Sequence, residues 1–300
     1  MSIRTPQDLR DAYQKFNEKV LSNPSATLAD MRKDAEVFAD MTTEPADVAT
    51  ESVNANGVPA LMLTPAGCAT DRVLQYTHGG GYVFCSAATH RRMAGHIAKA
   101  IGCRALVVDY RLAPEHVHPA PVNDALASYR WLLDQGIKPG HIALSGDSAG
   151  GGLVIATLLK ARDEGLPQPA GAVPISPWAD MSATGGSMQT RAAVDKCVSE
   201  AGIKQIAQLF LGGQAADGYA SPLGADLKGI APLYIQVGDE EVLLDDSIRI
   251  AHRALDAGVE VKLEIYPEMQ HIFQICAGNL PQADLAISRM AAWLKPRLGL

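Results

Sequence analysis

Short apolar runs typical of buried strands alternate with helix-like segments along most of the chain. This alternation constrains the fold more than any other feature of the sequence. Strands that alternate with helices form a mostly parallel sheet whose two faces are covered by helices. We therefore expect an α/β fold with one mostly parallel eight-stranded sheet. The strands are predicted at residues 48–53, 59–64, 72–77, 104–109, 142–145, 171–175, 233–237 and 260–266.

The predicted helices of this layered domain follow or separate the strands. The first two strands are joined near Asn56-Gly57, a dipeptide typical of tight turns. Helices are predicted at residues 89–102, 123–135, 151–164, 246–257 and 282–298.

The residues before the first strand have a different, polar and helical pattern. Leu9, Tyr13, Phe16 and Val20 recur at spacings of three and four, which indicates an amphipathic helix. A second helix is predicted over 28–41, after a break that contains Pro24. These helices form either a lid or a packed N-terminal arm, and helices in residues 181–220 can add to the lid.

Charge and cysteine content exclude several classes of function. The net charge is -7 and no basic stripe occurs, which argues against a nucleic-acid partner. The five cysteines are odd in number and lack the spacing of a zinc site or a redox pair, so we expect no metal and a reducing compartment. The N-terminal stretch has no apolar h-region and no apolar run reaches membrane-spanning length. A cytoplasmic protein with no membrane partner is expected.

The pentapeptide Gly146-Asp147-Ser148-Ala149-Gly150 has the form G-x-S-x-G. A predicted strand precedes it and a small-residue helix follows it, which is the context of a nucleophile elbow. Bulky neighbours would clash in so sharp a turn, and here the flanking residues are glycine and alanine. The free N–H groups of the helix start favour developing negative charge near Ser148. We predict Ser148 as a nucleophile rather than an incidental serine of a glycine-rich turn.

A glycine loop about seventy residues earlier supports the same chemistry. His78-Gly79-Gly80-Gly81 directly follows a predicted strand. Glycines let the backbone approach a ligand and direct its N–H groups inward, and an HGGG-type loop here is a known oxyanion element of lipases and esterases. We expect Gly80, Gly81 and Ala149 to donate to the oxyanion, and His78 to orient the loop without acting as the base.

A serine nucleophile needs a base and an orienting acid, in the chain order Ser, acid, His. Only His252 and His271 follow Ser148. His252 lies within a predicted helix, whereas His271 follows the last strand by a short loop, so His271 is the predicted base. The carboxylates that compete for the role of acid are Asp239, Glu240, Glu241, Asp245 and Asp246, the last two also explicable as caps of the following helix.

These features together resemble the hormone-sensitive-lipase-like family of bacterial esterases, on the α/β-hydrolase fold, over nearly the whole chain. The resemblance implies hydrolysis of short-chain carboxylic esters, in some members of lactones, without a cofactor or metal. It also implies an N-terminal helical cap over residues 1–42, a catalytic domain over 43–300 and a homodimer formed through the last strand. The motifs that carry it are residues 78–81 (HGGG), 109–115 (DYRLAPE), 146–151 (GDSAGG) and 269–273 (MQHIF).

The resemblance also selects among the carboxylates. The family's acid is an aspartate in a D-x-L-x-D-E pattern about thirty residues before the histidine. Here the matching stretch begins at Glu241, thirty residues before His271, so a glutamate stands where the family has an aspartate. A glutamate can serve as the acid. Glu241 is therefore the predicted acid, and Asp245 is the second candidate.

Four further positions have expected roles outside the chemistry. Arg111 and Glu115 are expected to pair and hold the loop behind the oxyanion element. Asp124 is expected to cap a helix or to form an ion pair, and Trp178 either lines the substrate pocket or belongs to the core.

The chemistry that follows is acyl transfer to Ser148 and hydrolysis of the resulting ester by water, on a small-molecule ester substrate. An amide or carbamate hydrolase with the same residues, or a ligand-binding protein with an inactive triad, remain the alternatives.

Overall fold

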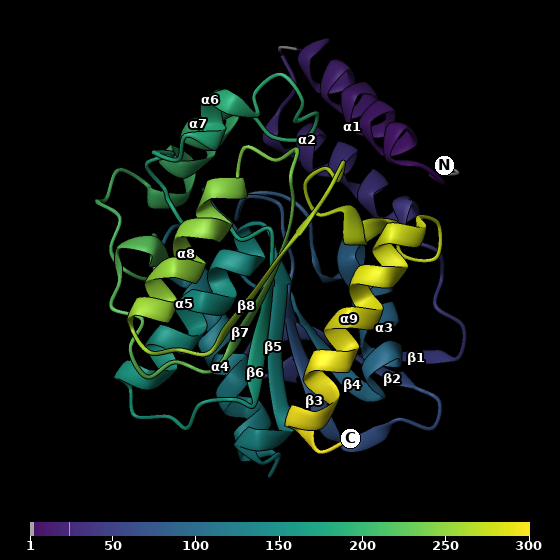
Figure 1. The fold of residues 1–300 in the computed structure, drawn as a ribbon, viewed down its shortest axis with the longest axis vertical. Coiled ribbons are helices and arrows are strands. Elements are labelled where there is room, and N and C mark those ends of the chain that lie inside the picture. The colour runs from purple at the N-terminus through teal and green to yellow at the C-terminus, as the bar shows by residue number, and fades with distance from the viewer. Residues whose placement is uncertain (1–2, 24) are drawn as a thin grey trace.

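The protein was analysed as a computed structural model, which describes residues 3–23 and 25–300. Within these residues eight strands form one sheet in the order β1-β2-β4-β3-β5-β6-β7-β8 (Figure 1). The strands from β4 to β8 in this order pair in parallel, and β1–β2 and β2–β4 pair antiparallel. The predicted mostly parallel eight-stranded sheet of an α/β-hydrolase fold is confirmed. The strands are Val48–Ala55, Val58–Pro65, Ala69–Thr77, Cys103–Val108, Ile142–Asp147, Gly171–Ile175, Leu233–Gly238 and Val261–Tyr266, β1 to β8 in chain order.

Helices cover both faces of the sheet, and each face has its own apolar core. Helices α4 (Ala120–Asp134), α5 (Ala149–Asp163) and α8 (Leu244–Asp256) pack on one face. Helices α3 (Ala87–Ile101) and α9 (Pro281–Leu298) pack on the other, as Figure 1 shows. A parallel sheet buried on both faces explains why its strands read as nearly continuous apolar runs.

The local sequence explains where several helices begin and end. Thr5 caps α1 (Pro6–Leu21) and forms a reciprocal capping box with Asp8. Ser86 and Thr89 do the same for α3, which ends at Gly102 in the left-handed conformation.

The second N-terminal helix differs from its predicted extent. Residues Leu28–Ala35 form α2, but Glu36–Met41 wind as a tighter 3-10 segment rather than continuing the helix predicted to residue 41. Residues three apart eclipse one another in a 3-10 helix. Phe38 and Met41 therefore share a face, on which Phe38 contacts the ring of Phe16 at a centroid distance of 5.0 Å and Met41 is buried.

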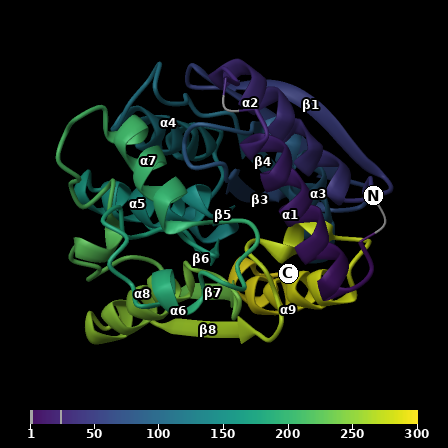
Figure 2. The same ribbon diagram turned by 90° about the horizontal axis from the view of Figure 1, so that it is seen from above.

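Helices α1, α2, α6 (Ser187–Thr190) and α7 (Glu200–Leu211) lie together beyond the carboxyl ends of the parallel strands. Seen from above in Figure 2, α1 and α2 lie across one half of this end and α6 and α7 across the other. Parallel α/β sheets bind ligands at the carboxyl ends of their strands. The division into a cap of residues 1–42 and a catalytic domain of 43–300 stays a prediction.

The start of α5 presses against the end of β3 more closely than any side chain would allow. A Cβ atom on Gly150 would lie 2.1 Å from the carbonyl oxygen of Thr77 and 2.4 Å from that of His78. Both obstacles are backbone atoms of a buried strand end, so neither can move away cheaply.

Gly150→Ala is therefore expected to lower the free energy of unfolding by at least about 2 kcal/mol, because the added methyl group forces α5 away from β3. Urea denaturation measures this change. The matched control is Gly140→Ala, where a Cβ atom meets nothing within 4 Å. Equal stability of the two variants would contradict the packing described for α5.

Candidate active site

Ser148 occupies the turn between β5 and α5, as the sequence predicts. Its backbone is strained, with φ 55° and ψ -121°, a conformation that persists only where the surroundings impose it. The N–H of Ser148 donates to the carbonyl of Ile175 at 2.9 Å. Its own carbonyl accepts from the N–H groups of Gly152 and Trp178 at 3.0 and 2.9 Å. These three bonds hold the serine at the end of β5.

The glycines around Ser148 are required by space. A Cβ on Gly146 would lie 2.5 Å from the carbonyl oxygen of Thr77, and one on Gly152 would lie 2.1 Å from that of Trp178. The predicted clash of bulky neighbours thus has identifiable partners, chiefly backbone carbonyl oxygens, together with the hydroxyl of Thr77 at 2.5 Å from a Cβ on Gly146.

His271 and Glu241 lie in direct contact in the interior. The Nδ1 atom of His271 is 2.7 Å from Oε2 of Glu241, and both side chains are buried. The other carboxylate oxygen of Glu241 accepts from the hydroxyl of Ser176 at 2.7 Å and from the N–H of Gly238 at 2.5 Å. A carboxylate can only accept, so Nδ1 carries the proton, and the Nε2 of a neutral ring is left as a proton acceptor.

Burial opposes the charged form of His271, but the adjacent Glu241 carboxylate outweighs it. The pKa of His271 is consequently raised above its ordinary value. The contact with Glu241 orients the ring, and it would stabilise the imidazolium formed if His271 took up a proton as a base.

The end of β6 joins the serine to this pair. Ile175 accepts from the N–H of Ser148, and its neighbour Ser176 bonds Glu241. Among the described residues no hydrogen bond joins the hydroxyl of Ser148 to His271. In ligand-free sites catalytic hydrogen bonds are often long and tighten only in the complex.

The predicted oxyanion loop has backbone donors without partners. Gly80 and Gly81 have positive φ angles of 103° and 63°, which glycine adopts freely. Within the part of the chain that the structure describes, the N–H groups of Gly80, Gly81 and Ala149 donate to no acceptor. Two glycines and the first residue of α5 thus supply free donors around the serine turn.

His78 contacts this loop from the interior of the domain. It is buried, its Nδ1 lies 2.7 Å from the carbonyl oxygen of Gly79, and its ring stacks on Tyr110 at a centroid distance of 4.2 Å. Burial lowers the pKa of His78 to about 3, so the ring is neutral. This agrees with the expected orienting role. His252, the other histidine considered, is exposed on α8.

The competing carboxylates bind elsewhere. Asp245 accepts from the N–H of Ser187 at 2.9 Å, and Asp246 accepts from those of Ala179 and Asp180 at 2.8 and 2.9 Å. The alternative that these residues cap α8 is wrong, since no side chain caps that helix. Asp245 thus binds the first residue of α6 and Asp246 binds the loop after β6, and the sequence does not place either segment beside these carboxylates.

Asp239 and Glu240 are also occupied outside the acid–base pair. The first accepts from the N–H of Glu268 at 2.7 Å, and the second forms an ion pair with Arg10.

The expected pairing of Arg111 with Glu115 is wrong. Arg111 donates to Asp124 at distances of 2.7 to 3.1 Å, which confirms the ion-pair interpretation of Asp124. Glu115 instead binds Arg32 of α2 with two hydrogen bonds of 2.8 and 2.7 Å. Asp124 lies 13 residues after Arg111, and Arg32 lies 83 residues before Glu115. Each arginine binds both oxygens of its carboxylate, a two-pronged contact that fixes orientation as well as distance.

Trp178 belongs to the core. Its side chain is buried, its Nε1 donates to the carbonyl of Asp180 at 3.1 Å, and its ring lies 6.1 Å from that of Tyr82.

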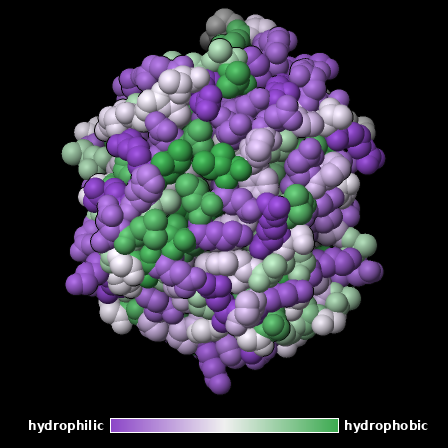
Figure 3. Space-filling view, viewed as in Figure 1, coloured by the Kyte–Doolittle hydropathy of each residue, from purple (hydrophilic) through white to green (hydrophobic). Residues whose placement is uncertain are grey.

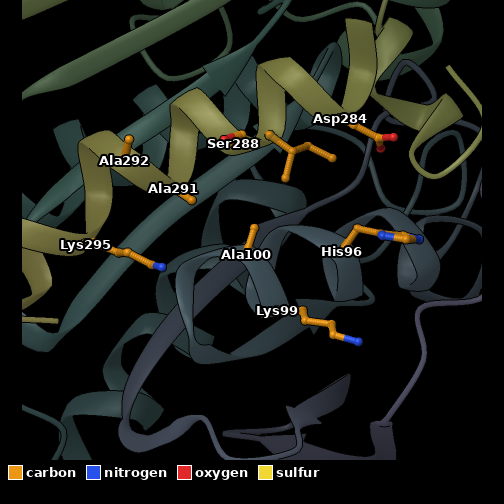
Figure 4. A pocket seen from close by; sticks show the side chains of 9 residues that line it. His96, Lys99, Ala100, Asp284, Ser288, Ala291, Ala292 and Lys295 are labelled. Carbon is orange, nitrogen blue, oxygen red and sulfur yellow. The ribbon is translucent and has the colours of Figure 1, made fainter. Parts of the chain in front are cut away.

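We also searched the described residues for other pockets, for metal sites and for membrane-spanning helices. A hollow between α3 and α9 has a volume of about 570 Å³ and is lined by none of the predicted site residues. Figure 4 shows some of its lining side chains, among them His96, Lys99 and Lys295. No group of side chains in residues 3–23 and 25–300 could hold a metal ion, and no helix there is long and apolar enough to cross a bilayer.

Comparison with known proteins shows the family of this chain. Residues 74–275 match the model of a family with the alpha/beta hydrolase fold. An acetyl-hydrolase of Streptomyces hygroscopicus is 41% identical over 265 residues, 88% of this chain and 87% of that protein. An esterase of the bacterial hormone-sensitive lipase family superposes with a TM-score of 0.93 at 45% identity, over 99% of this chain and 100% of the other. An esterase crystal soaked with p-nitrophenyl butyrate gives 0.92 at 44% identity, over 98% and 99%.

The buried carboxyl group of Asp246 generates a prediction about stability. Burial raises its pKa to about 7, and its Oδ1 atom has no partner. The ordinary value is 3.8. Between about pH 4 and pH 7 the folded protein therefore holds a proton that the unfolded chain has lost, and the free energy of unfolding falls as pH rises.

Asp246→Asn is expected to remove this fall in the free energy of unfolding, which amounts to up to about 4 kcal/mol. The amide stays neutral at every pH, and its oxygen can still accept from both N–H groups. Denaturation midpoints measured from pH 4 to pH 8 test this. A variant that keeps the wild-type slope over that range would contradict the assignment.

Proposed function

We propose that Ser148, His271 and Glu241 form the catalytic triad of this chain, which belongs to the hormone-sensitive-lipase-like esterases of the α/β-hydrolase fold. The chain is a serine carboxylic ester hydrolase, in agreement with its relatives named as esterases and acetyl-hydrolases. The observation that carries the proposal is the buried 2.7 Å contact between His271 and Glu241, beside a strained serine turn.

The proposed reaction begins with attack by the hydroxyl oxygen of Ser148 on the ester carbonyl. His271 takes the hydroxyl proton at Nε2, and Glu241 stabilises the resulting imidazolium through Nδ1. The carbonyl oxygen becomes negatively charged, and the free N–H groups of Gly80, Gly81 and Ala149 would bind it, each such donor contributing about 3 kcal/mol.

Collapse of this intermediate expels the alcohol, which receives the proton from His271, and leaves an acyl group on Ser148. Water then attacks the acyl group with His271 again as base, and the acid is released. The same residues thus serve both half-reactions.

We propose short-chain carboxylic esters as substrates. The support is the relative named as an acetyl-hydrolase and the related esterase soaked with a butyrate ester. We also propose that residues 1–42, with α6 and α7, form a cap over the carboxyl ends of the strands.

We further propose a homodimer that pairs β8 with β8 of a second copy. This strand lies at the edge of the sheet, so one row of its backbone groups has no strand partner. Figure 3 shows apolar side chains gathered on the face that α8 and β8 occupy in Figure 1, and Leu255 of α8 and Ile265 of β8 are exposed. Ile265→Lys should shift the species seen in analytical ultracentrifugation from dimer to monomer, and a monomeric wild type would contradict the proposal.

The five cysteines carry free thiols, which suits a reducing compartment, and we propose a cytoplasmic location. Fractionation of the native cell tests this, with recovery in the membrane or outside the cell as the contrary result.

The role of Ser148 is tested with a short-chain nitrophenyl ester. Turnover by the wild type should vanish in Ser148→Ala, because no other described residue at this turn offers a nucleophile to His271. A wild type without turnover would favour a ligand-binding protein, and an active Ser148→Ala variant would rule out the proposed mechanism.

The role of Glu241 is tested against the neighbouring carboxylate. Glu241→Gln should lower kcat by about four orders of magnitude, because the amide no longer enforces the right tautomer of His271. Asp245→Asn should keep kcat near the wild-type value. The reverse pattern would make Asp245 the acid.

A further inference from the structure

One face of α1 contacts the surroundings of the acid–base pair at three points. Arg10, Tyr13 and Asn17 are spaced by three and four residues, so they project from the same side of the helix. Each binds a different segment: the loop after β7, the loop after β8, and the loop that precedes α7.

Arg10 reaches the residue next to the proposed acid. Its Nε and Nη2 atoms donate to the two carboxylate oxygens of Glu240 at 2.7 and 2.6 Å, in the two-pronged geometry that fixes orientation as well as distance. The hydrogen bond from Arg10 lowers the pKa of Glu240, which therefore stays charged. Glu240 directly precedes Glu241.

Gln270 extends this contact to the proposed base. Its side-chain amide donates to Glu240 at 2.6 Å and to the carbonyl of Val194 at 2.9 Å, and its oxygen accepts from the N–H of Lys196 at 2.7 Å. The side chain is fully buried, and Gln270 directly precedes His271.

Tyr13 contacts the base residue itself. Its hydroxyl donates to the carbonyl oxygen of His271 at 2.8 Å, and both residues are buried. Water cannot replace this bond easily at a buried position, so its loss leaves the His271 carbonyl without a donor.

Asn17 joins α1 to the loop around Asp195, which in turn contacts the residue after Glu241. Its amide donates to the carbonyl of Lys196 at 2.7 Å, and Asp195 accepts from the N–H of Val242 at 2.8 Å. Val242 directly follows Glu241, so this loop is bonded to neighbours of both the acid and the base.

We propose that this face of α1 positions the acid–base pair. Tyr13 holds the backbone of His271 directly. Arg10 acts through Glu240 and Gln270, the residues next to Glu241 and His271, so that the two side chains keep their relative position. The proposal rests on the triad proposed above. These are positioning residues, because none of them contacts the reacting atoms. The N-terminal helix then acts on the chemical step as well as covering the site.

A purely structural anchor would give a different result from a positioning contact. Loss of an anchor lowers the free energy of unfolding and changes the access of substrate to the site. Loss of positioning instead lowers kcat and loosens the contact between His271 and Glu241. The Glu241 carboxylate, and more weakly Asp195 and Asp147, raise the pKa of His271. A looser contact should therefore move the acid limb of the kcat profile to lower pH.

The first test is Tyr13→Phe, which removes one oxygen and leaves the ring. The matched control is Tyr129→Phe, since that hydroxyl also donates at 2.8 Å to a backbone carbonyl, that of Pro167, on another part of the molecule. On a short-chain nitrophenyl ester, kcat of Tyr13→Phe should fall about tenfold, as expected for one lost hydrogen bond, with KM within about twofold. The acid limb should shift to lower pH in this variant alone.

The second test needs no change in the interior. Arg10→Gln removes a two-pronged ion pair, and its control Arg91→Gln removes another, with Glu44 at 2.5 and 2.7 Å. Arg10→Gln should lower kcat and shift the acid limb, and Arg91→Gln should do neither. This variant keeps the proposal open to refutation if Tyr13→Phe does not fold.

The proposal is overturned if Tyr13→Phe or Arg10→Gln matches its control in kcat and pH profile, or changes KM alone. Because Ser148→Ala and Glu241→Gln are assayed alongside, failure of the triad itself is recognised separately, by their retained activity.

Discussion

The hydrogen bond between Nδ1 of His271 and Oε2 of Glu241 brings two loops together at the carboxyl end of the sheet. It is buried, so the carboxylate needs further donors, and it obtains them from the Ser176 hydroxyl and the Gly238 N–H. Ser176 follows Ile175, whose carbonyl holds the N–H of Ser148. The end of β6 therefore fixes Glu241 and the serine turn relative to each other, and the arrangement of the proposed site depends on this strand end.

Close backbone packing is the second constraint. Gly146, Gly150 and Gly152 lie against carbonyl oxygens of neighbouring segments at distances where no Cβ atom fits. This proximity lets β5 turn sharply into α5 and leaves the first N–H groups of the helix beside Ser148. The glycines around Ser148 thus allow the close packing of the domain and also expose the N–H donors that the proposed reaction needs.

The sequence predicts most of the layered domain, because its signals are local. Apolar runs give the strands, and the glycines around Ser148 give the turn. His271 is predicted as the base from its place after the last strand. The prediction of Glu241 as the acid needs the resemblance to a family, since five carboxylates follow β7 and local pattern does not separate them. The pairing of Arg111 with Asp124, and the contacts of Asp245 with α6 and of Asp246 with the loop after β6, depend on tertiary proximity. In the sequence Tyr13 is an ordinary apolar position of an amphipathic helix. The positioning role proposed for it rests on its hydrogen bond to the His271 carbonyl, which only the structure shows.

The proton on Nδ1 of His271 gives the most direct measurement of the central contact. A buried imidazole proton shared with a carboxylate should resonate well downfield of the amide protons in a one-dimensional proton NMR spectrum. We predict such a signal in the wild-type protein, its loss in Glu241→Gln and its retention in Asp245→Asn. A downfield signal that survives in Glu241→Gln, or disappears in Asp245→Asn, would contradict the account.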